Sequence, residues 1–216
     1  MPRTGALPRR ALIAAVVGAS LALIAGPASM PARAAPDEAA GFVRVLIDHA
    51  IEVLRLPSNE KAQREAGFRD LLVSNFDLPL ITRLVVGRYW RQASEDQQRE
   101  FASAFEAHIV KVYTSQLGAY EDEHVEIRNV IARTDRDTIV TTDVIRQSDP
   151  PLRIDWLVRD DGGGGYKVID VAAEGVSMMT TKRSEFSSVI AREGLDGLIG
   201  RLKDLNARGG TEVGES

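Results

Sequence analysis

The spacing of apolar residues changes along this chain, and that change restricts the fold more than any other feature. Between residues 37 and 120 apolar residues recur at three- and four-residue steps, which is typical of amphipathic helices. Between residues 125 and 173 the spacing falls to two, as in Ile154, Trp156 and Val158, which indicates strands. The helical spacing returns after residue 181. Helices followed by strands and then by helices predict an α+β fold.

Local signals set the predicted boundaries. Asp77 is placed to cap one helix, Ser94 and Gln97 form a capping box for the next, and Gly194 breaks the last. The predicted helices span 37–56, 60–75, 77–90, 94–120, 182–192 and 195–206, and the predicted strands span 125–133, 138–147, 152–158 and 166–173. Tight turns between the strands predict a curved antiparallel sheet of about four strands, packed against helices. A sheet curving around a long helix leaves room for an apolar cavity.

The N-terminus has the pattern of an export signal. Arg3, Arg9 and Arg10 precede an apolar run over 11–26, and Ala32-Arg33-Ala34 matches a cleavage site. We therefore expect a signal peptide over residues 1–34, cleaved near Ala34, rather than a membrane anchor. The pair Arg9-Arg10 fits both twin-arginine and general export. A single domain over 35–207 and a disordered tail over 208–216 are expected to follow.

Composition excludes several classes of protein. Four of the 27 basic residues and none of the 31 acidic ones lie in the first 34 residues, which leaves a formal charge of −8. Such a charge argues against a nucleic-acid binder, which needs a positive surface. The chain has no cysteine, so disulfides, thiolate metal sites and thiol catalysis are excluded.

A search for catalytic or metal-binding motifs is negative. His49, His108 and His124 have no partner at metal-ligand spacing, and no nucleophile elbow, zinc-protease or phosphate-loop pattern occurs. The acidic run at 121–123 is interpreted as a solvated helix end. We predict no catalytic residue, no metal site and no cofactor.

Two sets of short runs, in their order and spacing, resemble the MlaC family, also called the toluene-tolerance auxiliary family. The first set is Phe76-Asp77, Val86-Gly87-Arg88-Tyr89-Trp90-Arg91 and Ala93-Ser94 with Gln97, Gln98 and Phe101. The second is Asp170-Val171, Glu174-Gly175-Val176-Ser177, Arg183-Ser184-Glu185-Phe186 and Gly194-Leu195-Asp196 with Leu198, Ile199 and Leu202. No single run is specific, but together they cover about Asp37 to Leu205.

The resemblance implies a soluble periplasmic lipid carrier and not an enzyme. Such a protein is expected to be a monomer with a cone-like fold akin to nuclear transport factors, and to hold acyl chains in its cavity. Its expected partners are an inner-membrane ABC complex with an MCE-domain ring and an outer-membrane lipid complex. The resemblance is compatible with two classes of lipid cargo, phospholipid and hopanoid.

Periodicity selects the candidate lipid-binding residues from the sheet face, the long helix and the C-terminal segment. They are Val85, Ile109, Tyr113, Val144, Ile154, Trp156, Val171, Met178, Phe186 and Ile190. Arg88, Arg91 and Arg183 also lie in the matching runs. For these three, structural salt bridges are favoured over contact with a phosphate or an acidic partner.

Two other functions are weighed against lipid transport. A small enzyme on the same fold would need Asp143, Asp155 or Asp170 to point into the cavity. A non-ligand adaptor would have a filled core. A continuous apolar cavity of roughly 1,000 Å³ would favour the carrier, and a cavity too small for one acyl chain would count heavily against transport.

Overall fold

A computed structural model describes residues 36–57, 59–116, 124–146 and 150–209, without the side chains of 115 and 116. All of them belong to Ala32–Ser216, one of two units into which the chain divides. The predicted signal peptide, the acidic run at 121–123 and residues 210–216 of the predicted tail lie outside the described residues. Within the described ranges, no helix is both long and apolar enough to cross a bilayer.

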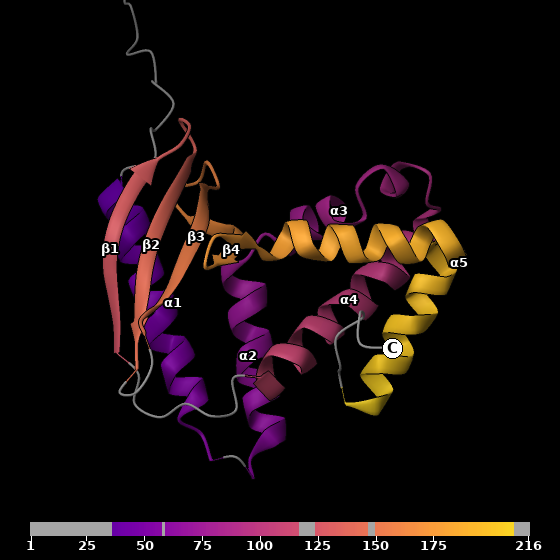
Figure 1. The fold of residues 1–216 in the computed structure, drawn as a ribbon, viewed down its shortest axis with the longest axis horizontal. Helices are drawn as coiled ribbons and strands as arrows, with labels where there is room; N and C mark the ends of the chain where they lie inside the picture. The colour runs from indigo at the N-terminus through magenta and orange to yellow at the C-terminus, as the bar shows by residue number, and fades with distance from the viewer. Residues whose placement is uncertain (1–35, 58, 117–123, 147–149, 210–216) are drawn as a thin grey trace, which may run out of the picture. The chain divides into compact units, whose positions relative to one another are not determined.

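The sheet is an antiparallel meander whose strands follow chain order (Figure 1). Its strands are β1 (His124–Ala132), β2 (Asp137–Ile145), β3 (Leu152–Asp160), β4 (Tyr166–Ala173) and β5 (Val176–Ser177). The four predicted strands are confirmed, and β5 is an additional short one. It forms because Glu174 and Gly175 both adopt positive φ, 49° and 79°, which reverses the chain within two residues.

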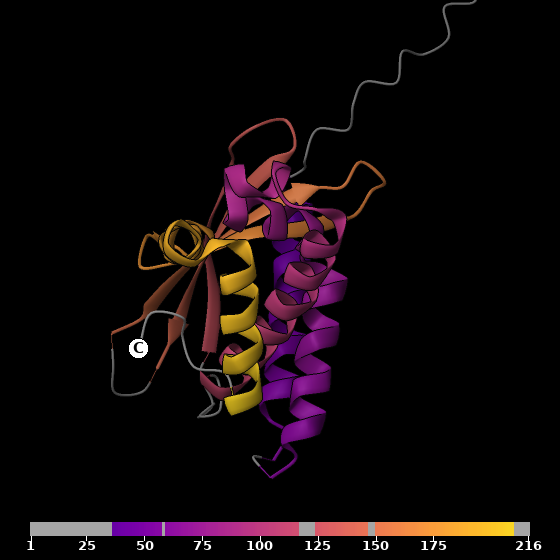
Figure 2. The same cartoon turned by 90° about the vertical axis from the view of Figure 1, so that its right-hand side faces the viewer.

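Helices form two groups around this sheet (Figures 1 and 2). The helices are α1 (Pro36–Leu54), α2 (Lys61–Asn75), α3 (Leu78–Val86), the 3₁₀ helix η1 (Gly87–Arg91), α4 (Glu95–Gln116) and α5 (Met178–Arg208). Helix α1 packs on β1 and β2, and α2 packs on α1. Helices α3 and α4 pack instead against α5, whose second half turns at Gly194 and lies beside α4. The predicted α+β class is therefore confirmed.

The predicted helix signals act as expected at three positions. The Asp77 carboxylate accepts a hydrogen bond from Leu80 N at 3.0 Å, and Ser94 and Gln97 bond each other's backbone N–H groups reciprocally. Gly194 adopts φ 74° and breaks the helical dihedrals of α5. The predicted helix 77–90 is too long, because Gly87 takes a positive φ of 61° and ends α3.

Two of three clusters of buried apolar residues hold the two groups of helices, and the third joins Leu46 of α1 and Leu71 of α2 to Val168 of β4. Ala39 and Val43 of α1 are fully buried against Val140 and Val158 of the sheet. The other core is built on an aromatic cluster of α4 and α5. Phe101 stacks on Phe105 at 5.5 Å, and Phe186 meets both rings edge-on at 5.9 and 5.6 Å. The space between these two cores is where a cavity can form.

An ion pair joins β2 to β3 at the end of the sheet. Asp137 and Arg159 are register partners, and the guanidinium donates to both carboxylate oxygens at 2.7 and 3.0 Å. These hydrogen bonds from Arg159 lower the pKa of the Asp137 carboxyl group and raise the pKa of Arg159. A carboxylate with a lowered pKa stabilises the fold above its unfolded pKa of about 3.9, and this stabilisation is lost as the pH falls.

We expect Asp137→Asn to lower the free energy of unfolding by about 1 kcal/mol at neutral pH. The difference from wild type should be constant between about pH 6 and 8 and shrink below about pH 4, because both proteins then lack the charge. Urea unfolding across this pH range measures it, with Asp135→Asn in the neighbouring turn as the control. A difference that persists at low pH would contradict this explanation.

Candidate functional site

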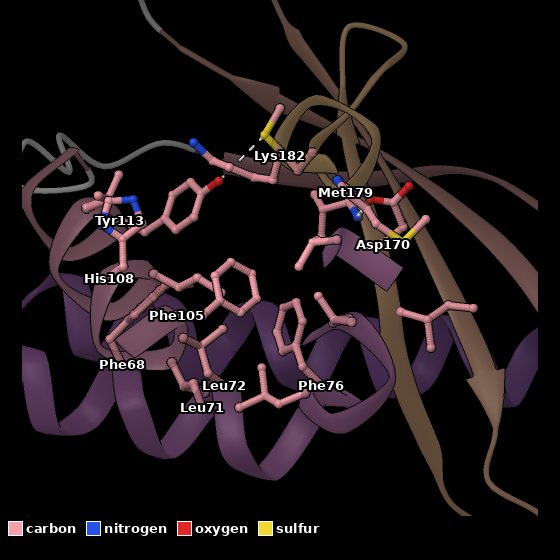
Figure 3. A pocket seen from close by; sticks show the side chains of 18 of the residues that line it. Phe68, Leu71, Leu72, Phe76, Phe105, His108, Tyr113, Asp170, Met179 and Lys182 are labelled. Carbon is pink, nitrogen blue, oxygen red and sulfur yellow. Dashed lines mark hydrogen bonds between the residues drawn. The ribbon is translucent and has the colours of Figure 1, made fainter. Parts of the chain in front are cut away.

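A cavity of about 270 Å³ lies between these two cores and is lined by residues of helices α1 to α5 and of strands β3 and β4. Apolar side chains from five helices and two strands form most of its wall (Figure 3). They are Leu46, Ala50, Phe68, Leu71, Leu72, Phe76, Leu78, Ile81, Val85, Phe105, Ile109, Val112, Trp156, Ile169, Val171, Met178 and Met179. A wall of this kind favours hydrocarbon and offers little to a polar solute.

The remaining four lining residues have polar or charged side chains: His108, Tyr113, Asp170 and Lys182. The hydroxyl of Tyr113 (Figure 3) meets the Met178 sulfur at 3.6 Å. The Lys182 ammonium donates to Glu185 at 3.0 Å. The Asp170 carboxylate accepts from Ser177 Oγ at 2.5 Å and from Met179 N at 3.1 Å.

The polar groups of Tyr113, Asp170 and Lys182 thus form hydrogen bonds with other groups of the protein. The polar atom of Trp156 is also bonded within the protein, because its Nε1 donates to the Thr142 hydroxyl at 3.0 Å. The polar atom of the tryptophan is therefore satisfied within the protein, and the residue contributes to the cavity wall. The wall as a whole imposes few directional demands on what it binds.

Six of the ten predicted lipid-binding residues line this cavity. They are Val85, Ile109, Tyr113, Trp156, Val171 and Met178. They come from α3, α4, β3, β4 and α5, so the structure brings together segments that are far apart in the chain. Whether they bind lipid remains a prediction.

The other four, Val144, Ile154, Phe186 and Ile190, lie outside the cavity lining. Val144 and Ile154 alternate onto the same face as Trp156, but they lie further along β2 and β3. Phe186 is fully buried in the aromatic cluster and Ile190 is 6% exposed in the same core. Periodicity identifies a buried face, and it does not separate a packed core from a cavity wall.

Sequence reasoning misses the contribution of the first two helices. Leu46 and Ala50 of α1 and Phe68, Leu71 and Leu72 of α2 form one side of the cavity. Their apolar stripes are visible in the sequence. The sequence places the cavity between the sheet and the long helix only, however, so nothing in it separates these stripes from ordinary packing.

The three arginines of the matching runs are exposed and form no ion pair within the described part of the chain. Arg88 instead donates to the Tyr89 hydroxyl at 2.9 Å and lies over that ring, and this hydrogen bond raises its pKa. Arg183 covers Gly87, with its Nε 3.1 Å from where a side-chain Cβ would be. The salt bridges favoured for Arg88, Arg91 and Arg183 are therefore not found among the described residues.

The three strand aspartates weighed for an enzyme are all engaged elsewhere. Asp143 accepts from Arg128 Nε at 2.6 Å, and Asp155 accepts from the Thr141 hydroxyl at 2.6 Å. Neither lines the cavity. Asp170 does line it, but its oxygens accept bonds from the start of α5. None of the three is arranged as a general base toward the cavity.

The cavity is smaller than the roughly 1,000 Å³ expected for a carrier. Its volume of about 270 Å³ is about a quarter of that. A two-chain lipid therefore needs more space than the cavity alone provides.

Comparison with known proteins gives one family. The family model described as "MlaC protein" matches residues 44–204. The intermembrane phospholipid transport system binding protein MlaC of Haemophilus influenzae is 22% identical over 155 residues, which is 68% of this chain and 72% of that protein. A phospholipid-binding protein from Ralstonia solanacearum, solved in complex with a phospholipid, has the same fold. Its TM-score is 0.68 at 24% identity, covering 79% of this chain and 97% of that one.

Two alanines of α1 test the cavity by stability alone. Ala50 lines it, whereas Ala39 is fully buried in the packed core between α1 and the sheet. We expect Ala50→Leu to raise the free energy of unfolding by about 0.5–1 kcal/mol, because the added methyls fill space. Ala39→Leu should lower it by about 1–3 kcal/mol through overpacking. Urea unfolding measures both, and equal destabilisation by the two variants would mean that the cavity is not there.

Proposed function

We propose that this chain, which belongs to the MlaC family, carries phospholipid across the aqueous space between two membranes, with acyl chain held in its cavity. The observation that carries the proposal is the cavity itself, whose wall is mostly apolar and whose lining residues Tyr113, Asp170 and Lys182 form hydrogen bonds within the protein. The similarity to the Haemophilus influenzae phospholipid transport protein and to the Ralstonia solanacearum phospholipid-binding protein supports it.

The physical need for such a carrier is large. Burying a methylene group contributes about 0.8 kcal/mol, so two chains of roughly sixteen carbons cost on the order of 25 kcal/mol to expose to water. A lipid therefore leaves a bilayer slowly unless its chains enter another apolar environment. A carrier therefore needs an apolar cavity, and the mostly apolar wall of this cavity supports that role.

The remaining parts of the proposal concern location and partners. The N-terminal export pattern supports a periplasmic protein released by cleavage near Ala34. In that compartment the chain would exchange lipid with an inner-membrane ABC complex that contains an MCE-domain ring and with an outer-membrane lipid complex. A monomer that moves freely between them would serve this role.

We expect protein purified from bacteria to carry lipid, detected by mass spectrometry after organic extraction. The lipid class found there separates phospholipid from hopanoid. Absence of any lipid, together with no uptake of labelled phospholipid from vesicles, would contradict the carrier function.

A matched pair of substitutions in α1 tests whether the lipid lies in the cavity. Ala50→Trp inserts a large ring among the lining residues, whereas Val45→Trp changes a side chain that is 54% exposed on the same helix. We expect Ala50→Trp to weaken uptake of labelled phospholipid about tenfold or more, and Val45→Trp to leave it unchanged. Equal uptake by the two variants would show that the lipid binds elsewhere.

A further inference from the structure

A groove of about 800 Å³ adjoins the cavity, between α3, η1 and the first half of α4. Leu78 and Phe105 line both the groove and the cavity, so the wall between the two spaces is one layer of side chains. The floor of the groove also includes apolar residues such as Pro79, Trp90 and Ala102. A ligand too large for the cavity therefore has adjoining space on this side.

The two shared side chains differ in how firmly they are held. Phe105 is 3% exposed and is fixed by Phe101 and Phe186 in the aromatic cluster. Leu78 is only partly buried and is the first residue of α3, directly after the Asp77 cap. Leu78 is therefore the less tightly packed of the two side chains that the cavity and the groove share.

The charged groups along the groove also differ. Arg99 pairs with Glu95 and Asp96, and Glu106 pairs with Arg69. Arg83 is exposed, and its Nε donates to the Pro79 carbonyl oxygen at 3.2 Å. Within the described residues it forms no ion pair, so its charge is not neutralised by a carboxylate of that part of the chain.

We propose that this groove binds the phosphate-bearing head group of a lipid whose acyl chain lies in the cavity, with Arg83 donating to the phosphate. The proposal rests on the proposed function and adds a second subsite to it. The cavity volume of about 270 Å³ is well below the roughly 1,000 Å³ expected for acyl chains, so we expect the glycerol and phosphate of a bound phospholipid to lie beyond it. A guanidinium suits that position, because its planar donors match phosphate oxygens.

The test compares two labelled probes, phosphatidylglycerol and an uncharged fatty alcohol with the same label. Arg83→Gln should weaken binding of phosphatidylglycerol about tenfold, through loss of a charge-assisted hydrogen bond, and change binding of the alcohol less than about twofold. Arg91→Gln is the matched control, because Arg91 is exposed nearby and lines neither the cavity nor the groove. It should bind both probes as wild type does.

A groove-filling variant gives a second, charge-independent measurement. Ser103 is exposed and lines only the groove, so Ser103→Trp should fold normally and obstruct the head group. We expect it to weaken phosphatidylglycerol binding severalfold without affecting the alcohol. Wild-type affinity for phosphatidylglycerol in both Arg83→Gln and Ser103→Trp would overturn the head-group site while leaving the cavity and the proposed function intact.

Inorganic phosphate distinguishes the lipid from a free anion as the source of the phosphate. Millimolar phosphate should not displace phosphatidylglycerol from the wild type, because the acyl chain contributes most of the affinity. Displacement of the lipid, or Arg83-dependent binding of phosphate alone, would overturn the assignment to a lipid head group. If the wild type binds neither probe, the proposed function fails and this inference fails with it.

Discussion

The carboxylate of Asp170 joins the sheet to the longest helix, and the cavity depends on that junction. It lies in β4 and accepts hydrogen bonds from the Ser177 hydroxyl and from Met179 N. Ser177 in turn caps α5 by accepting from Thr180 N at 3.0 Å. One partly buried charge with several donors thus fixes where α5 leaves the sheet. The first turn of α5 is thereby held over the cavity, where Met178 forms part of the wall.

The cavity lies between the core of α1 and the sheet and the aromatic core of α3, α4 and α5, beside a third buried cluster that includes Leu46 and Leu71. The small residues Ala39 and Val43 let α1 approach the sheet closely, while the Phe101, Phe105 and Phe186 rings fill the space among α3, α4 and α5. Side chains between the two cores reach the cavity from both sides without meeting across it. They have no dispersion partners on that side, which lowers the stability of the fold, and such a cost is common at binding sites.

Much of the secondary structure follows from local chemistry, so the sequence predicts it well. Asp77, Ser94 and Gly194 act within a few residues of themselves, and the structure confirms each of them. The cavity wall is predicted less well. Val144 and Phe186 satisfy the same periodicity as Trp156 and Ile109, yet only the latter two line the cavity. Apolar periodicity is a property of one element, whereas a cavity depends on how far apart several elements lie.

The sequence by itself determined the α+β class, the strand order and the absence of cysteine chemistry. Apolar spacing and turn residues specify elements from neighbouring residues, and composition needs no knowledge of how the elements pack. Only the tertiary structure decided that α1 and α2 form one side of the cavity, and that Leu78 and Phe105 separate it from a groove bordered by Arg83. The physical reason is that these contacts join residues distant in the chain. Their separation is set by the volumes of the two cores, and no segment of the sequence specifies it alone.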